Sequence, residues 1–471
     1  MADRVVVLMI CVQQNAQGGK DPDRGVFRCT KGGRGEMTKA PISLQDLRRR
    51  IYRKAKSEKA HRFWGLFGHV AKRETLAEAY HQAKRNGGAP GLDGQTFGDI
   101  EAGGVERFLA DIRADLLAGA YQPQPNRPVE IPKSNGTMRK LQIPCIRDRV
   151  VQGALKLILE AIFEADFCPN SYGYRPRRSP HQALAEVRRS LLRRMSTVIE
   201  VDLASYFDTI QHARLLQQIA RRVQDPAVLH LVKQVLKAGG KRGVPQGGPF
   251  SPLAANIYLN EVDWAFDAIR CKTAQGPYEA VNYHRFADDI IITVSGHHTK
   301  RGWAARALQR LQEVLAPLGV EMNREKTKVV NLLTDEAFTF LGFEVRRVRK
   351  RMRDGHFILL TPRKKARLAI KARIRDLLRH GGATPLKELI AQVNRVLAGW
   401  VQYFRVGNAS RAFSEIRDYV EMKVRTLLTR RKRRRKRSVG WRRWSNEYLY
   451  SVLGLFWDWK LRPLAGVEAH Q

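Results

Sequence analysis

Two adjacent aspartates between two apolar runs constrain the fold of this chain more than any other feature. The stretch 283–294 reads YHRFADDIIITV and contains Asp288 and Asp289. Runs of Ile, Val and aromatic residues favour strands, so we expect both carboxylates at the tight turn of a buried hairpin. Anions beside buried strands are costly unless they bind a cation or are protonated. A hard cation such as Mg²⁺ would suit them, because it prefers oxygen ligands and usually takes one or two carboxylates plus phosphates.

A third carboxylate for such a site lies in the stretch 198–208, which reads VIEVDLASYFD. A period of two places the apolar side chains on one face of a strand, and Glu200 with Asp202 on the other. A lone Asp at a strand end is usually a cap or a turn former. The inclusion of Asp202 in a cation site therefore depends on the hairpin that carries Asp288 and Asp289.

The charge balance indicates a polyanionic partner. The chain of 471 residues has 85 Lys and Arg against 45 Asp and Glu, a formal net charge of +40. Such an excess points to nucleic acid, with solubility alone as the bland alternative. The charge is densest in one uninterrupted block: Arg430, Arg431, Lys432, Arg433, Arg434, Arg435, Lys436 and Arg437.

That block either contacts a phosphate backbone or is a solvated tail, because eight consecutive cations are not expected to pack in a core. Residues 441–459 then supply Trp, Tyr and Phe side chains. A basic block followed by aromatic residues suits RNA, where stacking and charge act together.

Other compositional features narrow the class of protein. The hydrophobic content of 43% is ordinary for a globular protein, and the length allows two to four domains. The five cysteines form no CxxC pair, which suits a reducing cytosol and gives no zinc framework. The apolar run Val5–Val12 is too short to span a bilayer and lacks a clear cleavage site. We therefore expect a cytoplasmic protein, in a bacterial cytosol or nucleoid, without a membrane partner.

A second hairpin is predicted in 127–144, which reads RPVEIPKSNGTMRKLQIP. Lys133 and Arg139 lie on opposite sides of its Ser-Asn-Gly turn and could grip a triphosphate across it. The alternative is a solvated edge with charged side chains, and local sequence does not choose between the two.

Helical spacing predicts several helices outside these hairpins. Ser43 is expected to cap a helix that runs to Phe67, and a capping box at Thr75–Glu78 is expected to open the next. A third helix is expected over Pro385–Phe404. There, Trp400 and Tyr403 are interpreted as core residues rather than base stackers.

Three carboxylates with a nearby triphosphate grip suit phosphoryl transfer. Two Mg²⁺ ions about 4 Å apart could activate a 3′-hydroxyl and stabilise a leaving pyrophosphate. The ring of Phe207, close after Asp202, could fill the space that a ribose 2′-hydroxyl needs, which would favour dNTP over rNTP.

Seven motifs stand in an order that resembles a group II intron reverse transcriptase–maturase. They read RPVEIPKSNGTMRKLQIP, SYGYRP, VDLASYFD, GVPQGGPFSP, RFADD, GVEMNREKTK and FLGF, and cover roughly 75–345. The GGAPGLDG loop resembles the template-contacting N-terminal segment of that family, and NRVLAGWVQYF resembles its maturase region. Together these extend the resemblance to about 45–460.

The resemblance implies an α+β fold: a right-hand polymerase of fingers, palm and thumb with an antiparallel palm sheet. The expected division is 1–42 flexible N-terminal extension, 43–125 N-terminal helical segment with the template-contacting loop, 126–345 reverse transcriptase fingers and palm, 346–428 helical thumb/maturase (X) domain, and 429–471 basic DNA- and RNA-binding segment.

The resemblance also implies a function and a set of site residues. The expected activity is RNA-directed DNA synthesis from dNTPs with two Mg²⁺ ions, and the expected partners are the intron RNA, in a ribonucleoprotein, and a DNA target and primer. The residues carried over are Asp202, Asp288 and Asp289 as catalytic metal ligands, Lys133 and Arg139 as nucleotide-binding fingers residues, Phe207 as the sugar gate, and Gln246 beside the nascent base pair.

Two alternatives stay open: a non-enzymatic RNA-binding maturase with a polymerase core that serves only as a scaffold, and a reverse transcriptase of a defence system. Many relatives end in an HNH endonuclease domain with paired cysteines, whereas this sequence has no Cys after Cys271. We therefore expect a protein without that domain, which does not nick the second DNA strand itself.

Overall fold

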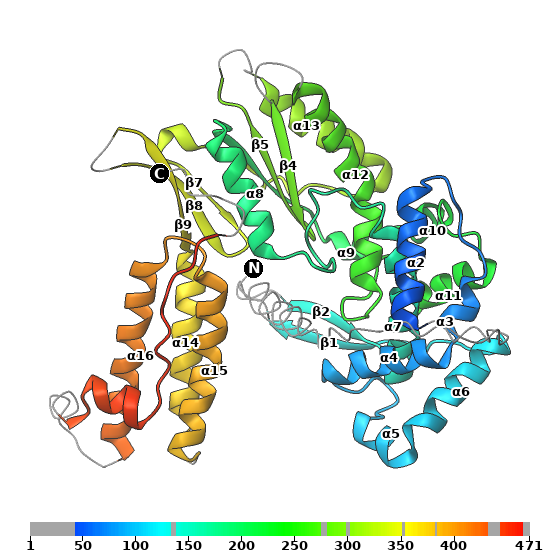
Figure 1. Ribbon diagram of the computed structural model, residues 1–471, viewed down its shortest axis with the longest axis horizontal. Coiled ribbons are helices and arrows are strands. Elements are labelled where there is room, and N and C mark those ends of the chain that lie inside the picture. Colours follow the sequence, from blue (N-terminus) through cyan, green and yellow to red (C-terminus); the bar gives the residue numbers. More distant parts are fainter. Residues whose placement is uncertain are drawn as a thin grey trace, which may run out of the picture.

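The central sheet is built by the two stretches that carry the aspartates. Strands β4 (Val281–Phe286) and β5 (Asp289–Val294) form the predicted hairpin, and β3 (Thr197–Asp202) pairs with β5. The short strand β6 (Lys328–Asn331) completes the order β4-β5-β3-β6, and every pairing is antiparallel. Figure 1 shows this sheet with helices beside it, which confirms the expected α+β class.

The structure is a computed structural model that describes residues 43–132, 138–274, 280–297, 302–350, 354–381, 384–431 and 443–464, with only the backbone of Arg139. The predicted N-terminal extension therefore lies outside the described residues.

Both faces of the central sheet are buried, and each face belongs to a different hydrophobic core. On β5, Ile290 and Ile292 pack in the first core, whereas Ile291 between them packs in the second. Alternating side chains point to opposite faces of a strand, so an unbroken apolar run is required where both faces are covered. This explains why DIIITV reads as a continuous rather than an alternating pattern.

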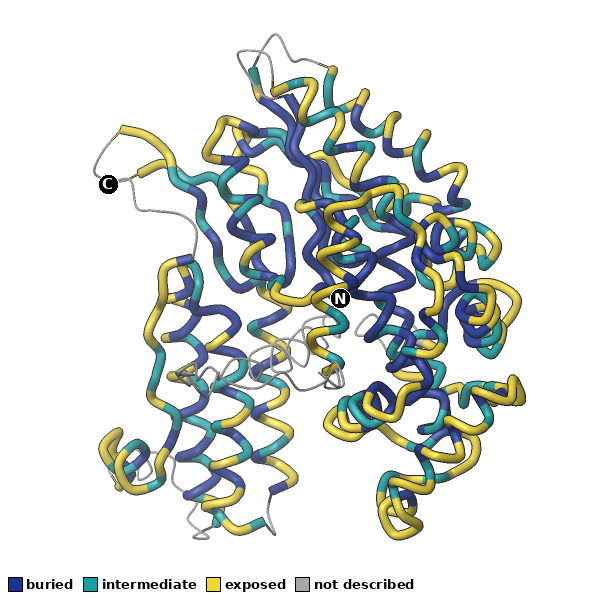
Figure 2. Tube along the Cα trace, turned by 45° about the vertical axis from the view of Figure 1, so that its right-hand side comes forward, coloured by how far each residue is buried: buried dark blue, intermediate teal, exposed yellow. Residues whose placement is uncertain are grey.

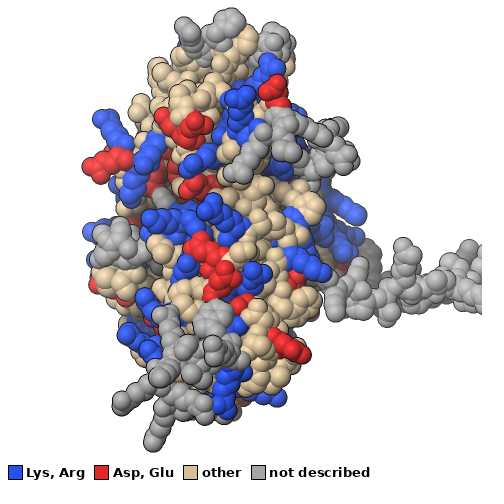
Figure 3. Space-filling view, turned by 90° about the vertical axis from the view of Figure 1, so that its left-hand side faces the viewer, with Lys and Arg blue, Asp and Glu red and all other residues tan. Residues whose placement is uncertain are grey.

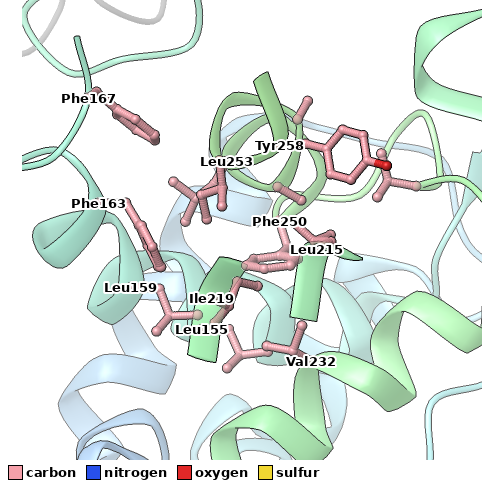
Figure 4. Packing of buried hydrophobic residues seen from close by; sticks show 14 of the residues in the cluster. Leu155, Leu159, Phe163, Phe167, Leu215, Ile219, Val232, Phe250, Leu253 and Tyr258 are labelled. Atoms are coloured by element: carbon pink, nitrogen blue, oxygen red, sulfur yellow. The ribbon is translucent and has the colours of Figure 1, made fainter. Parts of the chain in front are cut away.

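The first core joins the central sheet to the helices before and around it. In Figure 4, side chains from α7, α10, α11 and α12 interdigitate, among them Leu155, Ile219 and Leu253. The helices of this region are α2 (Leu44–Ser57), α3 (Leu66–Val70), α4 (Arg73–Arg85), α5 (Phe97–Gly103), α6 (Val105–Leu117), α7 (Ile146–Phe163), α9 (Tyr206–Thr209), α10 (His212–Ala220), α11 (Pro226–Lys237), α12 (Ser251–Ala274) and α13 (Trp303–Leu315), with a 3₁₀ turn at Ala316–Leu318. Helix α8 (Pro180–Leu192) packs instead in the second core.

The second predicted hairpin is also present. Strands β1 (Arg127–Pro132) and β2 (Met138–Ile143) pair antiparallel, from Arg127 opposite Ile143 to Pro132 opposite Met138. The turn between them lies outside the described residues.

The second core joins the other face of the central sheet to a smaller sheet and a helical bundle (Figure 1). The sheet has the order β7-β8-β9, and a 3₁₀ turn, Leu332–Thr334, leads into it. Trp400 and Tyr403 are buried in this core, as predicted. The elements are β7 (Ala337–Phe340), β8 (Phe343–Arg349), β9 (His356–Pro362), α14 (Lys364–His380), α15 (Leu386–Phe404) and α16 (Ser410–Arg431).

Residues 443–464 fold back onto this bundle, so the aromatic residues after the basic block mostly serve packing. Trp444 is buried, and Tyr448, Tyr450, Phe456 and Trp459 are packed partly buried against the second core. The chain makes one π-helical turn at Tyr448–Val452 and then runs extended along the bundle (Figure 2). Trp457 is an exception, with 69% of its surface exposed. The RNA-stacking interpretation of this whole stretch was therefore wrong for most of its rings.

Two predicted helix boundaries were also wrong. Ser43 caps α2 as expected, but the helix ends at Ser57, because Phe63 is extended and pairs with Val223 of a distant segment. The following helix, α4, begins at Arg73 rather than at the predicted capping box. The Thr75 hydroxyl donates instead to the carbonyl of His69, so its side chain is used within the preceding turn.

Among the helices that the structure describes, none is both long enough and apolar enough to cross a bilayer.

Candidate active site

Two of the predicted site aspartates lie directly opposite each other on neighbouring strands. Asp202, the last residue of β3, is the cross-strand partner of Asp289, the first residue of β5. Such partners have Cα atoms about 4.5–5.5 Å apart and side chains on the same face of the sheet. Like charges directly opposite each other are unfavourable, so this register favours a bound cation between or beside the two carboxylates.

Asp288 occupies the two-residue turn that joins β4 to β5. Phe286 and Asp289 are paired, which leaves Ala287 and Asp288 as the turn. Ala287 has a φ of 57°, in the left-handed region that glycine usually fills at such positions. A non-glycine residue there costs about 1 kcal/mol or more. Both Asp288 and Asp289 are half-buried beside this strained turn.

A lysine from another part of the chain approaches the same site. Lys326 Nζ lies 3.5 Å from Asp202 Oδ2, and the N–H of Asn323 donates to the carbonyl of Asp202 at 2.8 Å. Leu203 forms an isolated bridge with Met322, so the segment before β6 extends the sheet beside the end of β3. The motif GVEMNREKTK contains Lys326, but no local pattern relates it to Asp202, and only the fold brings the two together.

A large cavity of about 1360 Å³ brings most of the predicted site residues together. It is lined by Asp202, Asp288, Asp289, Phe207 and Gln246, and the β1–β2 hairpin contributes to its wall. The lining also includes cations that the sequence reading passed over: Arg48, Lys140, Arg149, Lys156, Arg175, Arg178, Arg242, Lys326 and Lys365. A carboxylate cluster within a cationic wall suits a ligand that carries both metal ions and phosphates.

Some of these cations share a helix face that the sequence could have revealed. Arg149, Gly153, Lys156 and Glu160 are spaced three or four residues apart on α7, so they lie on one face of that helix. All four line the cavity. Lys365, by contrast, comes from the start of α14 in the C-terminal bundle, and no local pattern relates it to the aspartates.

Phe207 lies at the cavity wall close to Asp202, the last residue of β3. It is the second residue of α9, its ring packs edge-on against Tyr206 at 5.5 Å, and its carbonyl accepts the N–H of Val244 at 2.8 Å. Burial raises the pKa of Tyr206 well above its usual value. Tyr206 therefore stays neutral, and its hydroxyl donates to the carbonyl of Ala255, which anchors α9 to α12.

The loop that carries Gln246 is docked on strand β2. The N–H of Gln142 donates to the carbonyl of Gln246 at 3.0 Å, and the Gln142 side chain donates to the carbonyl of Gly239. Gly247 has a φ of +136°, and a Cβ there would lie 2.8 Å from the carbonyl oxygen of Gln142. Only glycine permits this approach, so the Gly-rich loop is fixed by contact rather than left free.

The two predicted triphosphate ligands cannot be placed at the cavity. Lys133 lies outside the described residues, and of Arg139 only the backbone, in β2, is described. Their neighbours Met138, Lys140 and Gln142 do line the cavity. Lys140 is therefore a cation that the β1–β2 hairpin contributes to the cavity that the aspartates line.

The aspartates also lie near the C-terminal bundle. Burial, and after it the charge of Asp289, raises the pKa of Tyr403 on α15. The Tyr403 hydroxyl donates to the carbonyl of Leu341 at 2.8 Å. The carboxylate end of the central sheet is thus in electrostatic reach of the bundle that follows it.

The donor chemistry of the three aspartates fits Mg²⁺. Among the residues that the structure describes, no group of three or more Asp, Glu, His or Cys side chains could by itself hold a metal ion. Mg²⁺ in phosphoryl-transfer sites completes its coordination with water and substrate phosphates. Asp202, Asp288 and Asp289 therefore suit a site in which the substrate supplies part of the coordination.

The two described residues of the basic block, Arg430 and Arg431, do not line this cavity. Arg430 is exposed at the end of α16, whereas the Arg431 guanidinium donates to the carbonyls of Gly381 and Thr384, at 2.7 and 2.5 Å. Arg431 thus ties two segments together, and Lys432–Arg437 lie outside the described residues. On the side of α16 and the β7–β9 sheet, many Lys and Arg side chains reach the surface (Figure 3).

Comparison with known proteins identifies two families in the chain. A sequence model for reverse transcriptase (RNA-dependent DNA polymerase) matches residues 131–345, and one for the group II intron maturase-specific domain matches 367–446. Protein YkfC of Escherichia coli (strain K12) is 35% identical over 365 residues, which cover 69% of this chain and 94% of YkfC. The group II intron-encoded protein LtrA of Lactococcus lactis subsp. cremoris is 29% identical over 374 residues, 64% of this chain and 61% of LtrA.

The antiparallel central sheet, the aspartates at its turn and the first of these matches define a protein of the reverse transcriptase class. With the maturase-specific match that follows, the chain belongs to the reverse transcriptase–maturases of group II introns, as the motif order had indicated.

Proposed function

We propose that this protein is an active RNA-directed DNA polymerase that copies a group II intron RNA and also binds that RNA to assist splicing and mobility. The observation that carries the proposal is the register of Asp202 opposite Asp289, with Asp288 in the adjoining turn, on the wall of one cationic cavity. A protein that only bound RNA would not need three like charges gathered there, because their proximity costs free energy without a cation.

Each residue of the site has a proposed role. Asp202, Asp288 and Asp289 would hold Mg²⁺, which when bound would supply Lewis-acid stabilisation of the primer 3′-oxygen and the leaving pyrophosphate. Lys140, with Lys133 and Arg139 of the same hairpin, would neutralise the triphosphate. Phe207 would exclude a ribose 2′-hydroxyl, and Gln246 would lie beside the nascent base pair.

The rest of the chain would serve the nucleic-acid partners. We propose the domain division expected from sequence, with a helical segment at 43–125, fingers and palm at 126–345, a thumb/maturase domain at 346–428 and a basic segment at 429–471. The intron RNA would bind in a ribonucleoprotein, and a DNA target and primer would enter the cavity. This activity belongs in a bacterial cytosol or nucleoid.

Primer extension tests the proposal. Purified protein is assayed on poly(rA)/oligo(dT) with Mg²⁺ and dTTP, wild type beside Asp288→Asn. We expect the substitution to lower the rate roughly a hundredfold or more, because metal stabilisation is worth several kcal/mol and each ~1.4 kcal/mol is a factor of ten. Binding of the RNA should be unchanged.

Asp111→Asn is the matched control, because Asp111 is an exposed carboxylate on α6, far along the chain from the site. Its rate should equal that of the wild type. A wild-type protein that extends no primer, yet promotes intron splicing, would favour the alternative of a maturase with a polymerase core that acts only as a scaffold.

A further inference from the structure

A fully buried ion pair lies behind the turn that carries Asp288. Arg285 of β4 and Asp263 of α12 are both 0% exposed. The guanidinium grips the carboxylate with two bonds, Nε to Oδ1 at 2.7 Å and Nη2 to Oδ2 at 2.5 Å. Burial acts to lower the pKa of Arg285, but Asp263 outweighs it and raises the pKa, so the guanidinium stays charged.

The remaining guanidinium nitrogen reaches the strained turn itself. Arg285 Nη1 donates to the carbonyl of Ala287 at 2.9 Å and to Asn256 Oδ1 at 3.0 Å. Ala287 is the residue with the left-handed φ of 57°, directly before Asp288. A residue in this region persists only where its surroundings hold it, and here the Arg285 fork supplies that restraint.

The SYGYRP loop closes on the turn from another direction. Asn256 Nδ2 donates to the carbonyl of Gly173 at 2.8 Å, and the N–H of Arg285 donates to the carbonyl of Asn170 at 3.0 Å. A Cβ on Gly173 would lie 2.2 Å from the backbone nitrogen of Ala287. Asn256 therefore links the loop, the guanidinium and helix α12 around one turn.

Stability alone does not account for this arrangement. A buried ion pair can often be replaced by apolar residues without loss of stability, because desolvation offsets the attraction between the charges. What apolar residues cannot supply is the planar fork of Arg285, with donors in fixed directions toward Asp263, Asn256 and Ala287.

We propose that Arg285 is a positioning residue for the metal-binding turn. Locked by Asp263 and Asn256, it holds the Ala287 carbonyl and thereby sets the direction in which Asp288 leaves the turn toward Asp202 and the cavity. The inference rests on the proposed function, since it assumes that the aspartates bind the metal of the polymerase reaction.

Asn256→Ala is the variant of choice, because it removes the hydrogen bonds of Asn256 to Arg285 and Gly173 while leaving the Arg285–Asp263 pair intact. The matched control is Asn260→Ala, one turn further along α12. The Asn260 amide also bonds backbone groups, the carbonyl of Asp166 and the N–H of Cys168, and both of these residues lie outside the turn. Arg285→Lys, which keeps the charge and loses the fork, is the second variant.

The readouts are the Mg²⁺ concentration for half-maximal primer extension and the affinity for Mn²⁺ measured by electron paramagnetic resonance. We expect Asn256→Ala to need roughly five times more metal in both, the size of one lost hydrogen bond. Template–primer affinity and the thermal midpoint should match those of Asn260→Ala. Arg285→Lys should shift the metal requirement further in the same direction.

Wild-type metal affinity in folded Asn256→Ala would overturn the inference, as would an equal shift in Asn260→Ala. If the wild type extends no primer, the proposed function fails, and the Mn²⁺ titration still decides the positioning role. The Asp288→Asn variant gives the background level of Mn²⁺ binding in that titration. Wild-type Mn²⁺ binding no stronger than this background would also overturn the inference. If Arg285→Lys does not fold, Asn256→Ala decides alone.

Discussion

The selection of deoxyribose over ribose is expected to depend on the ring of Phe207. It lines the cavity close to Asp202 and is held edge-on by Tyr206. Phe207→Ala should open space for a 2′-hydroxyl and lower the preference for dCTP over CTP by about 10- to 200-fold, the range for small changes in pocket size. The measurement is the ratio of kcat/KM values for the two nucleotides on one template.

Phe207→Tyr is the control, since it keeps the bulk of the ring. Its preference for dCTP should stay near that of the wild type. An unchanged ratio in Phe207→Ala would mean that another group excludes the ribose.

Single residues differed in how far the sequence could place them. The hairpin at Asp288 and Asp289 was predictable because their apolar flanks favour strands, but its turn is formed by Ala287 and Asp288, and Asp289 is already the first residue of β5. Lys326 and Arg285 were not assigned, because their partners Asp202 and Asp263 are distant in sequence or on another element. Neither residue type nor local spacing records such a pairing.

At the scale of elements, one amide on α15 bonds the start of residues 454–464, while Arg405 after the helix bonds Asp458 and Lys460 further along. Asn394 Nδ2 donates to the carbonyl of Gly454 at 2.7 Å, and Asn394 Oδ1 accepts the N–H of Phe456 at 2.8 Å. Asn394→Ala should leave both backbone groups unpaired and cost about 1–2 kcal/mol. Hydrogen exchange at the Phe456 amide should then accelerate about 5- to 30-fold.

Lys387→Ala, an exposed position near the start of the same helix, is the matched control and should leave that exchange rate unchanged. Equal exchange at Phe456 in Asn394→Ala and wild type would show that the other contacts, apolar packing and the Arg405 hydrogen bonds, are enough to dock the segment.

Elements were predicted well where a local signal had no competitor. The strands β1 and β2 and the helix α15 lie where their patterns put them. The end of α2 did not, because the extended pairing of Phe63 with Val223 interrupts a helical pattern through a partner far along the chain. The aromatic residues after the basic block had the composition of a stacking surface, and only the fold shows that Trp444 is core and that four others pack partly buried against the bundle.

For the molecule as a whole, the net charge of +40 is expected to govern nucleic-acid affinity through salt. Replacing Arg433, Arg434 and Arg435 with Gln should weaken RNA binding. It should also make the negative slope of log K against log salt less steep by up to about 2–3, since each phosphate contact contributes roughly 0.7–0.9. Titrations between about 50 and 200 mM salt measure this slope.

Neutralising the exposed cations Lys272, Arg306 and Arg310 removes the same charge elsewhere and serves as the control. If both triple variants change the slope equally, net charge rather than the basic block would explain the affinity.

The sequence by itself determined the class of this protein, because hydrophobic alternation, turn residues and motif order are local properties that survive without knowledge of the fold. It also placed Asp202 at the end of a strand and Asp288 and Asp289 at a hairpin. Tertiary structure alone decided which of these groups meet: that Asp202 falls opposite Asp289, that Lys326 and Lys365 reach the same cavity, and that a buried guanidinium holds the turn. Such contacts join residues far apart along the chain, and their geometry is set by packing of whole elements, which a linear pattern does not encode.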